Sequence, residues 1–309
     1  MDMIAQNYIG CDVSKATLDF FSEATRRWTR IANDEVAIAA FAAGLDPARD
    51  FVVLEATGVY DRLLRHGLAG AGIAFSRRNP EHTHSYSRSG PGRAKTDRLD
   101  ARMLADYGRS HQPQPDPPPS EQAERFQSLV RRRDTLVELR AIQIKQRKQA
   151  FDADVICDID SLTGDLERRI AAIERLIKTA IAEAEEIAAR YKLLVSAPGV
   201  SMVTAVSLIA MLPELGQRSP KTIAALAGVA PITSESGKSK HKSRIRGGRD
   251  RVRNALYMAA LSACRHPRFN DAYKAIAARS ASKKLAIIAI ARKLLVCLNA
   301  MIRDQNAFA

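Results

Sequence analysis

A proline-rich segment at residues 112–119, Gln-Pro-Gln-Pro-Asp-Pro-Pro-Pro, constrains the fold of this 309-residue chain more than any other feature. Proline fixes φ and has no backbone N–H, so such a run continues neither a helix nor a central strand. We therefore place a domain boundary there. Because the chain is too long for one average domain, we predict three parts: residues 1–118, 119–192 and 193–309.

The first part alternates short apolar runs with helical patterns. Residues 8–13 and 17–21 predict a β-hairpin, and residues 51–54 predict a buried strand. A helix is expected from about residue 57 to 69, and the polar residues 79–95 predict a loop. Strands alternating with helices predict a mixed α/β sheet.

The second part predicts two long helices, with a break around residues 158–161. Leu166, Ile173 and Ile181 fall on one helical face, which favours a helical hairpin or coiled coil that dimerises. Residues 193–309 predict an all-helical domain. Its Pro198-Gly199-Val200 turn is similar to a helix-hairpin-helix, in which backbone N–H groups meet a phosphate.

The excess of positive over negative charge is confined to the last part of the chain. The whole chain holds 48 Lys and Arg against 34 Asp and Glu, a net charge of +14. Residues 194–309 hold 19 Lys and Arg against 5 Asp and Glu, so they carry the entire excess. This uneven charge predicts a polyanionic partner, most simply nucleic acid, although a basic surface without a partner is the alternative.

Other features of the composition exclude several classes of protein. The four cysteines lie far apart, which argues against a zinc ribbon or a disulfide scaffold. No uninterrupted apolar run reaches the roughly 18 residues that span a bilayer, so no membrane partner is expected. The N-terminal residues do not resemble a signal peptide, and we expect a cytoplasmic protein.

Four acidic residues stand in positions that suit metal binding. Asp12 and Glu55 lie on or at the end of apolar strands, while Asp97 and Asp100 are three residues apart on one predicted helix. Converging carboxylates repel one another and so favour a divalent cation, and two such cations suit phosphoryl transfer. For any one acid alone, a helix-capping or surface role is the simpler interpretation.

A second group of residues surrounds Ser236 in the sequence Ser-Glu-Ser-Gly-Lys-Ser at 234–239. A serine in a basic loop can attack a phosphodiester, and nearby cations stabilise the charge that develops. The same stretch also fits a flexible loop that only contacts phosphates. The cations expected to bind nucleic acid are Lys238, Lys240, Lys242, Arg244, Arg246, Arg249, Arg251 and Arg253.

Several motifs occur in an order that resembles a known family. They are YIGCDVSK, LEATGVY, NP followed by KTDRLDARMLA, SAPGVSMVTA, LAGVAP, SESGKS and RNALYMAA. The set resembles the DEDD transposases of the insertion-sequence one-ten family and their kin, the Piv-like DNA invertases. The resemblance spans nearly the whole chain.

The resemblance implies a RuvC-like, ribonuclease-H-type N-terminal domain and a helical transposase domain at the C-terminus. It implies that Asp12, Glu55, Asp97 and Asp100 hold magnesium or manganese and that Ser236 forms a covalent link to DNA. Ser234 and Ser239 are close enough to be alternatives. It further implies donor and target DNA, a non-coding bridge RNA, and assembly as a homodimer or homotetramer.

Three other functions compete with a transposase. A RuvC-like structure-selective nuclease would need the acids and water but not the serine. A basic DNA-binding protein without activity would not need an intact set of four acids. An actin-like phosphotransferase would leave the basic C-terminal part unexplained.

Overall fold

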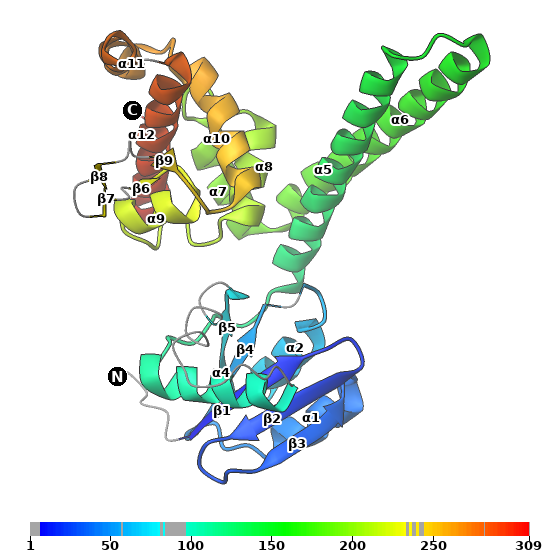
Figure 1. The fold of residues 1–309 in the computed structure, drawn as a ribbon, viewed down its shortest axis with the longest axis vertical. Helices are drawn as coiled ribbons and strands as arrows, with labels where there is room; N and C mark the ends of the chain where they lie inside the picture. The colour runs from blue at the N-terminus through cyan, green and yellow to red at the C-terminus, as the bar shows by residue number, and fades with distance from the viewer. Residues whose placement is uncertain are drawn as a thin grey trace. The chain divides into compact units, whose positions relative to one another are not determined.

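The computed structural model describes residues 7–56, 58–80, 83, 97–232, 235–236, 239–240, 244–280 and 282–308. For residues 97–98, 232, 235–236, 239–240 and 244 it describes the backbone alone. The chain forms two compact units, Met1–Ser120 and Glu121–Ala309 (Figure 1). Each unit has a hydrophobic core of its own, and the predicted three-part division stays a prediction.

The N-terminal unit is built on a five-stranded sheet in the order β3-β2-β1-β4-β5. Strands β1, β2 and β3 pair antiparallel, and β1, β4 and β5 pair parallel. The strands are β1 (Asn7–Val13), β2 (Thr17–Ser22), β3 (Trp28–Ala32), β4 (Asp50–Glu55) and β5 (Ala74–Arg78). The predicted mixed α/β sheet is therefore confirmed.

Helices cover both faces of this sheet. Helices α1 (Glu35–Ala43) and α2 (Arg62–Gly70) pack on the face that holds Ile9 and Cys11. Helix α4 (Asp97–His111) lies across the other face, against Tyr8 and its neighbours (Figure 1). Alternate residues of a strand point to opposite faces, so β1 buries both sets of side chains and reads as one continuous apolar run.

The C-terminal unit is mostly helical, as predicted. Its helices are α5 (Glu121–Arg147), α6 (Ala153–Glu183), α7 (Glu185–Val195), α8 (Met202–Met211), α9 (Pro220–Leu226), α10 (Asp250–Ala263), α11 (Pro267–Arg279) and α12 (Lys283–Asp304). The Gln127 side-chain amide donates to the Ala210 carbonyl over 2.7 Å and ties the base of α5 to α8.

Two local predictions were wrong. The break between the long helices lies at residues 148–152 rather than 158–161, because the Asp152 carboxylate caps α6 by accepting from Asp154 N and Val155 N. Helix α2 begins at Arg62 rather than near residue 57, because Gly58 adopts φ +73° in a turn before the helix.

Helix α12 forms the centre of the C-terminal core. Ile290, Leu294 and Leu298 are fully buried against the surrounding helices. Within the described part of the chain it is the one helix long and apolar enough to cross a membrane, and 56% of that stretch is buried inside the unit. Such burial is what the central helix of a packed bundle shows.

The region around Ser236 differs from the all-helical prediction. Strands β6 (Pro231–Ile232) and β9 (Arg244–Ile245) pair antiparallel, and β7 (Glu235–Ser236) pairs with β8 (Ser239–Lys240). These strand pairs form two short β-ribbons, β6 with β9 and β7 with β8. The two are here called, together, the serine ribbon. Antiparallel pairing satisfies backbone N–H and C=O groups of these two-residue strands, which are too short to form a helical turn.

Candidate functional site

One row of charged side chains crosses the α4 face of the sheet near the carboxyl ends of β1 and β4. The register pairs Asp12 with Asp19, Asp19 with Arg30, and Glu55 with Arg78. Paired residues in a sheet point to the same face. Strands β1 and β4 pair through Cys11 and Leu54, the residues just before Asp12 and Glu55. The row therefore places two of the predicted acids side by side.

Helix α4, which carries the other two predicted acids, packs on this face. A Cβ on Gly10 would overlap the carbonyl oxygen of Ala101, so the helix backbone rests directly on β1. Asp12 lies two residues after Gly10 and thus on the same face. Asp100 immediately precedes Ala101, and the helix begins at Asp97, whose side chain is outside the described structure. The four acids therefore belong to elements that pack against one another, and their convergence stays a prediction.

Asp19 is an acid that the sequence analysis did not single out. It is 6% exposed, lies opposite Asp12, and accepts a hydrogen bond of 2.7 Å from Arg30 Nε. Burial and the nearby charges of Asp12 and Asp19 raise the pKa of the Cys11 thiol well above its ordinary value. The signal in the sequence was its place on the predicted hairpin, but the register that sets it opposite Asp12 came only from the structure.

Glu55 is oriented by a residue from the predicted loop. Thr83 Oγ1 donates to Glu55 Oε2 over 2.8 Å, and it lies 3.0 Å from the carbonyl oxygen of Pro80. The Thr83 side chain is fully buried. This contact shows that at least one residue in the 79–95 segment belongs to the acidic face.

The donor set suits a hard divalent cation. Carboxylate oxygens are the ligands that magnesium and manganese prefer. Within the residues whose side chains the structure describes, no three His, Cys, Asp or Glu side chains converge closely enough to hold an ion. The predicted set includes Asp97, whose side chain lies outside that description, so the site stays a prediction.

The serine ribbon places Ser236 directly opposite Ser239. Both belong to two-residue strands described by their backbone, whereas Ser234, Lys238 and Lys242 lie outside the described residues. Lys240 and Arg244 lie on β8 and β9, again as backbone. The choice of Ser236 over its neighbours stays a prediction.

Close glycine contacts hold the base of the serine ribbon. Gly228 has φ +68° and Gly248 has φ +72°, and a Cβ on Gly248 would overlap the amide nitrogen of Gly228. Arg253 Nη1 donates to the carbonyl oxygen of Gly247 over 2.7 Å. Only glycine fits such close backbone approaches at positive φ, so these residues fix where the ribbon leaves the helical core.

Three of the arginines expected to bind nucleic acid have partners within the protein. Arg249 makes two hydrogen bonds of 2.6 Å to Glu214, and Arg251 approaches Asp134 on α5 at 3.3 Å. Arg253 pairs with Asp250. Burial raises the pKa of Glu214, but the hydrogen bonds and charge of Arg249 outweigh it and hold that pKa below its ordinary value. These arginines contribute to folding, whereas Arg246 is exposed.

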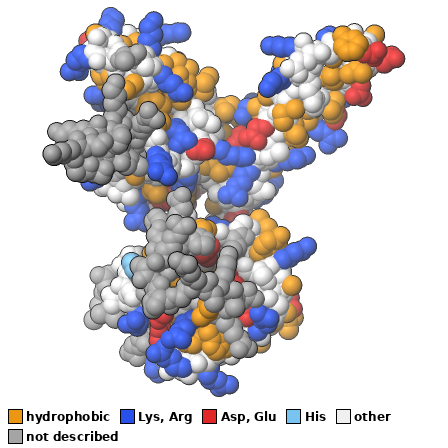
Figure 2. Space-filling view, in the orientation of Figure 1, with side chains coloured by type: hydrophobic (Ala, Val, Ile, Leu, Met, Phe, Trp, Pro, Cys, Tyr) orange, Lys and Arg blue, Asp and Glu red, His pale blue; other side chains and the backbone are white. Residues whose placement is uncertain are grey.

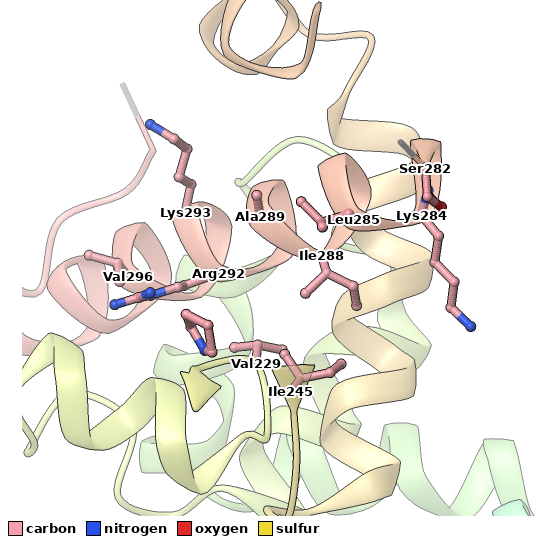
Figure 3. A pocket seen from close by; sticks show the side chains of 11 residues that line it. Val229, Ile245, Ser282, Lys284, Leu285, Ile288, Ala289, Arg292, Lys293 and Val296 are labelled. Carbon is pink, nitrogen blue, oxygen red and sulfur yellow. The ribbon is translucent and has the colours of Figure 1, made fainter. Parts of the chain in front are cut away.

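A groove of about 1100 Å³ lies beside the base of the ribbon (Figure 3). Leu285, Ile288 and Val296 of α12 line it together with Ile245 of β9, while Lys284, Arg292 and Lys293 add positive charge. Figure 2 shows Lys and Arg side chains spread over the visible face of the C-terminal unit. The surface near the ribbon is therefore positively charged.

Comparisons with known proteins agree over both units. A transposase family of the DEDD type found in IS110 elements matches residues 9–153, and the family described as "Transposase IS116/IS110/IS902 family" matches residues 191–274. The pilin gene-inverting proteins of Moraxella lacunata and Moraxella bovis are each 30% identical to the chain over 317 residues. Those alignments cover 99% of this chain and 98% of each relative.

An IS110 protein from another bacterium shares part of the sequence. The insertion element IS110 uncharacterized 43.6 kDa protein of Streptomyces coelicolor is 34% identical over 153 residues. That alignment covers 48% of this chain and 36% of the relative.

Proposed function

The chain belongs to the IS110 family of DNA transposases and recombinases, and on this premise we propose that it cuts and rejoins DNA strands with a carboxylate-held metal and a serine nucleophile. As a member of this family it is an enzyme that acts on DNA. One observation supports the proposal: β1, β4 and α4, the elements that carry Asp12, Glu55, Asp97 and Asp100, pack against one another in a single unit.

The N-terminal unit acts as a RuvC-like, ribonuclease-H-type domain in this proposal. A five-stranded sheet with three antiparallel and two further parallel strands supports that assignment. The four acids would hold magnesium or manganese, which, when bound, neutralises phosphate charge and activates the attacking oxygen. Thr83 keeps one oxygen of Glu55 in a fixed direction.

Ser236 carries the covalent step. Its Oγ attacks a backbone phosphorus and loses its proton, a serine–phosphate bond forms, and the bond to one strand breaks, releasing that strand as a hydroxyl. A DNA hydroxyl then attacks the same phosphorus and releases the serine, which regains a proton. The number of phosphodiester bonds is unchanged, so no energy source is needed. The positive charge beside the ribbon stabilises the charge that develops.

A trapped adduct tests this proposal. The purified protein is incubated with magnesium and labelled DNA that carries the junction of its own element, with the flanking RNA co-expressed. After denaturation, label should stay on the protein, and the modified peptide should contain Ser236. Ser236→Ala should abolish the adduct, while Ser234→Ala and Ser239→Ala serve as matched controls that keep it.

Asp12→Asn should abolish strand cleavage without changing the fold. The substitution is nearly isosteric, but it removes a charge needed to hold a divalent cation. An adduct formed equally by Asp12→Asn would contradict the metal assignment. An adduct mapped to another serine would contradict the Ser236 assignment.

A hydrolytic nuclease is the second candidate. All four predicted acids belong to elements of the N-terminal unit, so water could serve as the nucleophile there. Cleaved DNA without an adduct, unaffected by Ser236→Ala, would establish this function instead.

We also propose a bridge RNA and self-association as partners. The excess positive charge of residues 194–309 favours a second nucleic acid beside DNA, and the Pro198-Gly199-Val200 turn would act as a helix-hairpin-helix-like contact. The α5–α6 hairpin would form a coiled coil between two or four copies, because Ile142, Val155 and Leu162 are exposed along it. RNA extracted from the purified protein and a mass from light scattering test both.

A further inference from the structure

The two arginines at the ends of the charged row are held differently. At one end, Arg30 Nε donates to the buried carboxylate of Asp19 over 2.7 Å, so this charge is already matched. At the other end, Arg78 is the sheet neighbour of Glu55 and pairs with Asp116 through Nη2 alone, while its Nε has no partner among the described residues. We propose that Arg78 binds a backbone phosphate of the DNA strand beside the carboxylates, an inference that rests on the proposed function.

The position of Arg78 on the α4 face follows from the sheet. Ala74 of the same strand packs with Tyr8 and Phe51 in the cluster beneath α4. Arg78 lies four residues further along β5, an even number, and therefore on the same face. It pairs in register with Glu55, and neighbouring strands lie about 4.8 Å apart. A phosphate reached by the carboxylates would thus be within reach of this guanidinium.

One edge of the Arg78 guanidinium is anchored by the proline-rich segment. Arg78 Nη2 donates to Ser76 Oγ and lies 3.4 Å from Asp116 Oδ1. Asp116 is itself fixed, because its amide donates to the Phe75 carbonyl over 2.8 Å and its carboxylate accepts from Arg77 N over 2.7 Å. This edge of the group is therefore held in place before any ligand arrives, which lowers the entropy cost of binding.

Another part of the guanidinium has no hydrogen-bond partner among the described residues. Arg78 Nε is buried, and it has no hydrogen-bond partner among the residues described here. A buried N–H without an acceptor is unfavourable, so the position favours an incoming oxygen. No ion pair between Arg78 and Glu55 occurs in the described structure, where the Glu55 carboxylate instead accepts from Thr83. A planar guanidinium matches phosphate oxygens in geometry and in charge.

Arginine-directed labelling tests the proposal without requiring catalysis. The full-length protein is treated with phenylglyoxal, with and without duplex DNA, and the labelling of each arginine is measured by peptide mass spectrometry. DNA at ten times its dissociation constant should slow the labelling of Arg78 roughly tenfold, as expected for about 90% occupancy. Exposed Arg27, on the turn between β2 and β3, is the matched control and should keep its rate.

Equal labelling of Arg78 with and without DNA would overturn the proposal, as would protection by an RNA duplex but not by DNA. The same measurement on Asp12→Asn separates this site from the proposed chemistry. Protection of Arg78 in a variant that cannot cleave supports the phosphate site by itself. If Asp12→Asn cleaves normally, the metal assignment fails while the labelling result still stands.

Variants distinguish phosphate binding from a structural role. Arg78→Gln should lower the rate of strand cleavage about 10²-fold, the usual effect of removing one group that stabilises developing charge. Arg78→Lys should recover part of that loss, because lysine restores the positive charge but not the planar, two-pronged set of N–H donors of a guanidinium. Arg27→Gln removes the same charge and should cleave normally. If Arg78→Gln and Arg78→Lys both cleave at the rate of Arg27→Gln, Arg78 only holds the proline-rich segment.

Discussion

In the N-terminal unit the candidate acids lie on strands and a helix that pack along their length, whereas Ser236 in the C-terminal unit lies on a two-residue strand. Sheet register and the contact between Gly10 and Ala101 fix the backbone positions of the elements that carry these acids. Among the described residues, the contacts that hold the serine ribbon lie at its base, at Gly228 and Gly248. Under the proposed function, the difference teaches that a metal site needs a rigid frame, whereas a nucleophile that must reach DNA can lie on a short ribbon.

Gly10→Ala gives the largest expected effect, and it tests whether α4 packs rigidly on the sheet of the N-terminal unit. The new Cβ would overlap the backbone of α4, which cannot move without leaving Tyr8 and Val53. We expect the free energy of unfolding to fall by about 3 kcal/mol or more, since overpacking against backbone is costly. Trp28 is the one tryptophan of the chain and packs near Ala101, so its fluorescence in urea reports this loss.

Gly70→Ala is the matched control. Gly70 ends α2, and a Cβ there would meet nothing within 4 Å. This substitution should leave stability unchanged or raise it by about 0.5 kcal/mol, because alanine favours helix. Equal losses for both variants would show that α4 does not rest on β1 as described.

Asp61→Asn tests a buried ion cluster in the same unit. Asp61 is fully buried between Arg65, at 3.2 Å, and Arg77, and the exchange leaves both cations without their carboxylate. We expect a loss of about 3 kcal/mol in the Trp28 unfolding experiment. Asp165→Asn on α6 removes a carboxylate that also contacts two arginines, but at the surface, and should change nothing measurable.

The sequence predicted more of the acidic face than of its surroundings. Asp12 and Glu55 could be singled out because they interrupt or end apolar strands, and Asp100 because it lies three residues after Asp97 on a predicted helix. Asp19 and Asp61 were missed, since their burial depends on Arg30 and Arg77, which are distant in sequence. Such pairings depend on register, and single-sequence patterns do not contain register.

The serine ribbon could not be predicted for a related reason. Its strands are two residues long and form only because Gly228 and Gly248 bring two distant segments together. Likewise, charge alone suggested that Arg249 and Arg251 contact nucleic acid. In the structure, Arg249 forms an ion pair with Glu214 and Arg251 forms one with Asp134. Composition predicts the sign of the net charge on a surface, but it does not show which charged side chains form ion pairs within the protein.

Gly248→Ala, compared with Gly247→Ala, tests the base of the ribbon. Both residues have positive φ, so each substitution carries a backbone cost of about 1 kcal/mol. A Cβ on Gly248 also overlaps Gly228, whereas one on Gly247 meets nothing within 4 Å. We expect Gly248→Ala to lose about 1 kcal/mol more than Gly247→Ala in urea unfolding followed by circular dichroism, and to lose strand exchange as well. Equal values for the two would mean that the glycine contact does not hold the ribbon.

Glu23→Gln gives the smallest expected effect and sharpens the comparison on the acidic side. A hydrogen bond with Asp106 on α4, together with burial, raises the pKa of Glu23, although Arg26 and Arg109 oppose the shift. A carboxyl with a higher pKa in the folded state binds its proton more tightly there, so its stabilising effect is present at low pH. That effect is lost as the pH rises through the folded pKa. Between pH 4 and 7 the wild type should therefore lose slightly more stability than Glu23→Gln, as measured by Trp28 fluorescence in urea. Parallel curves would show that Glu23 and Asp106 do not share a proton, and that α4 is held by its apolar face alone.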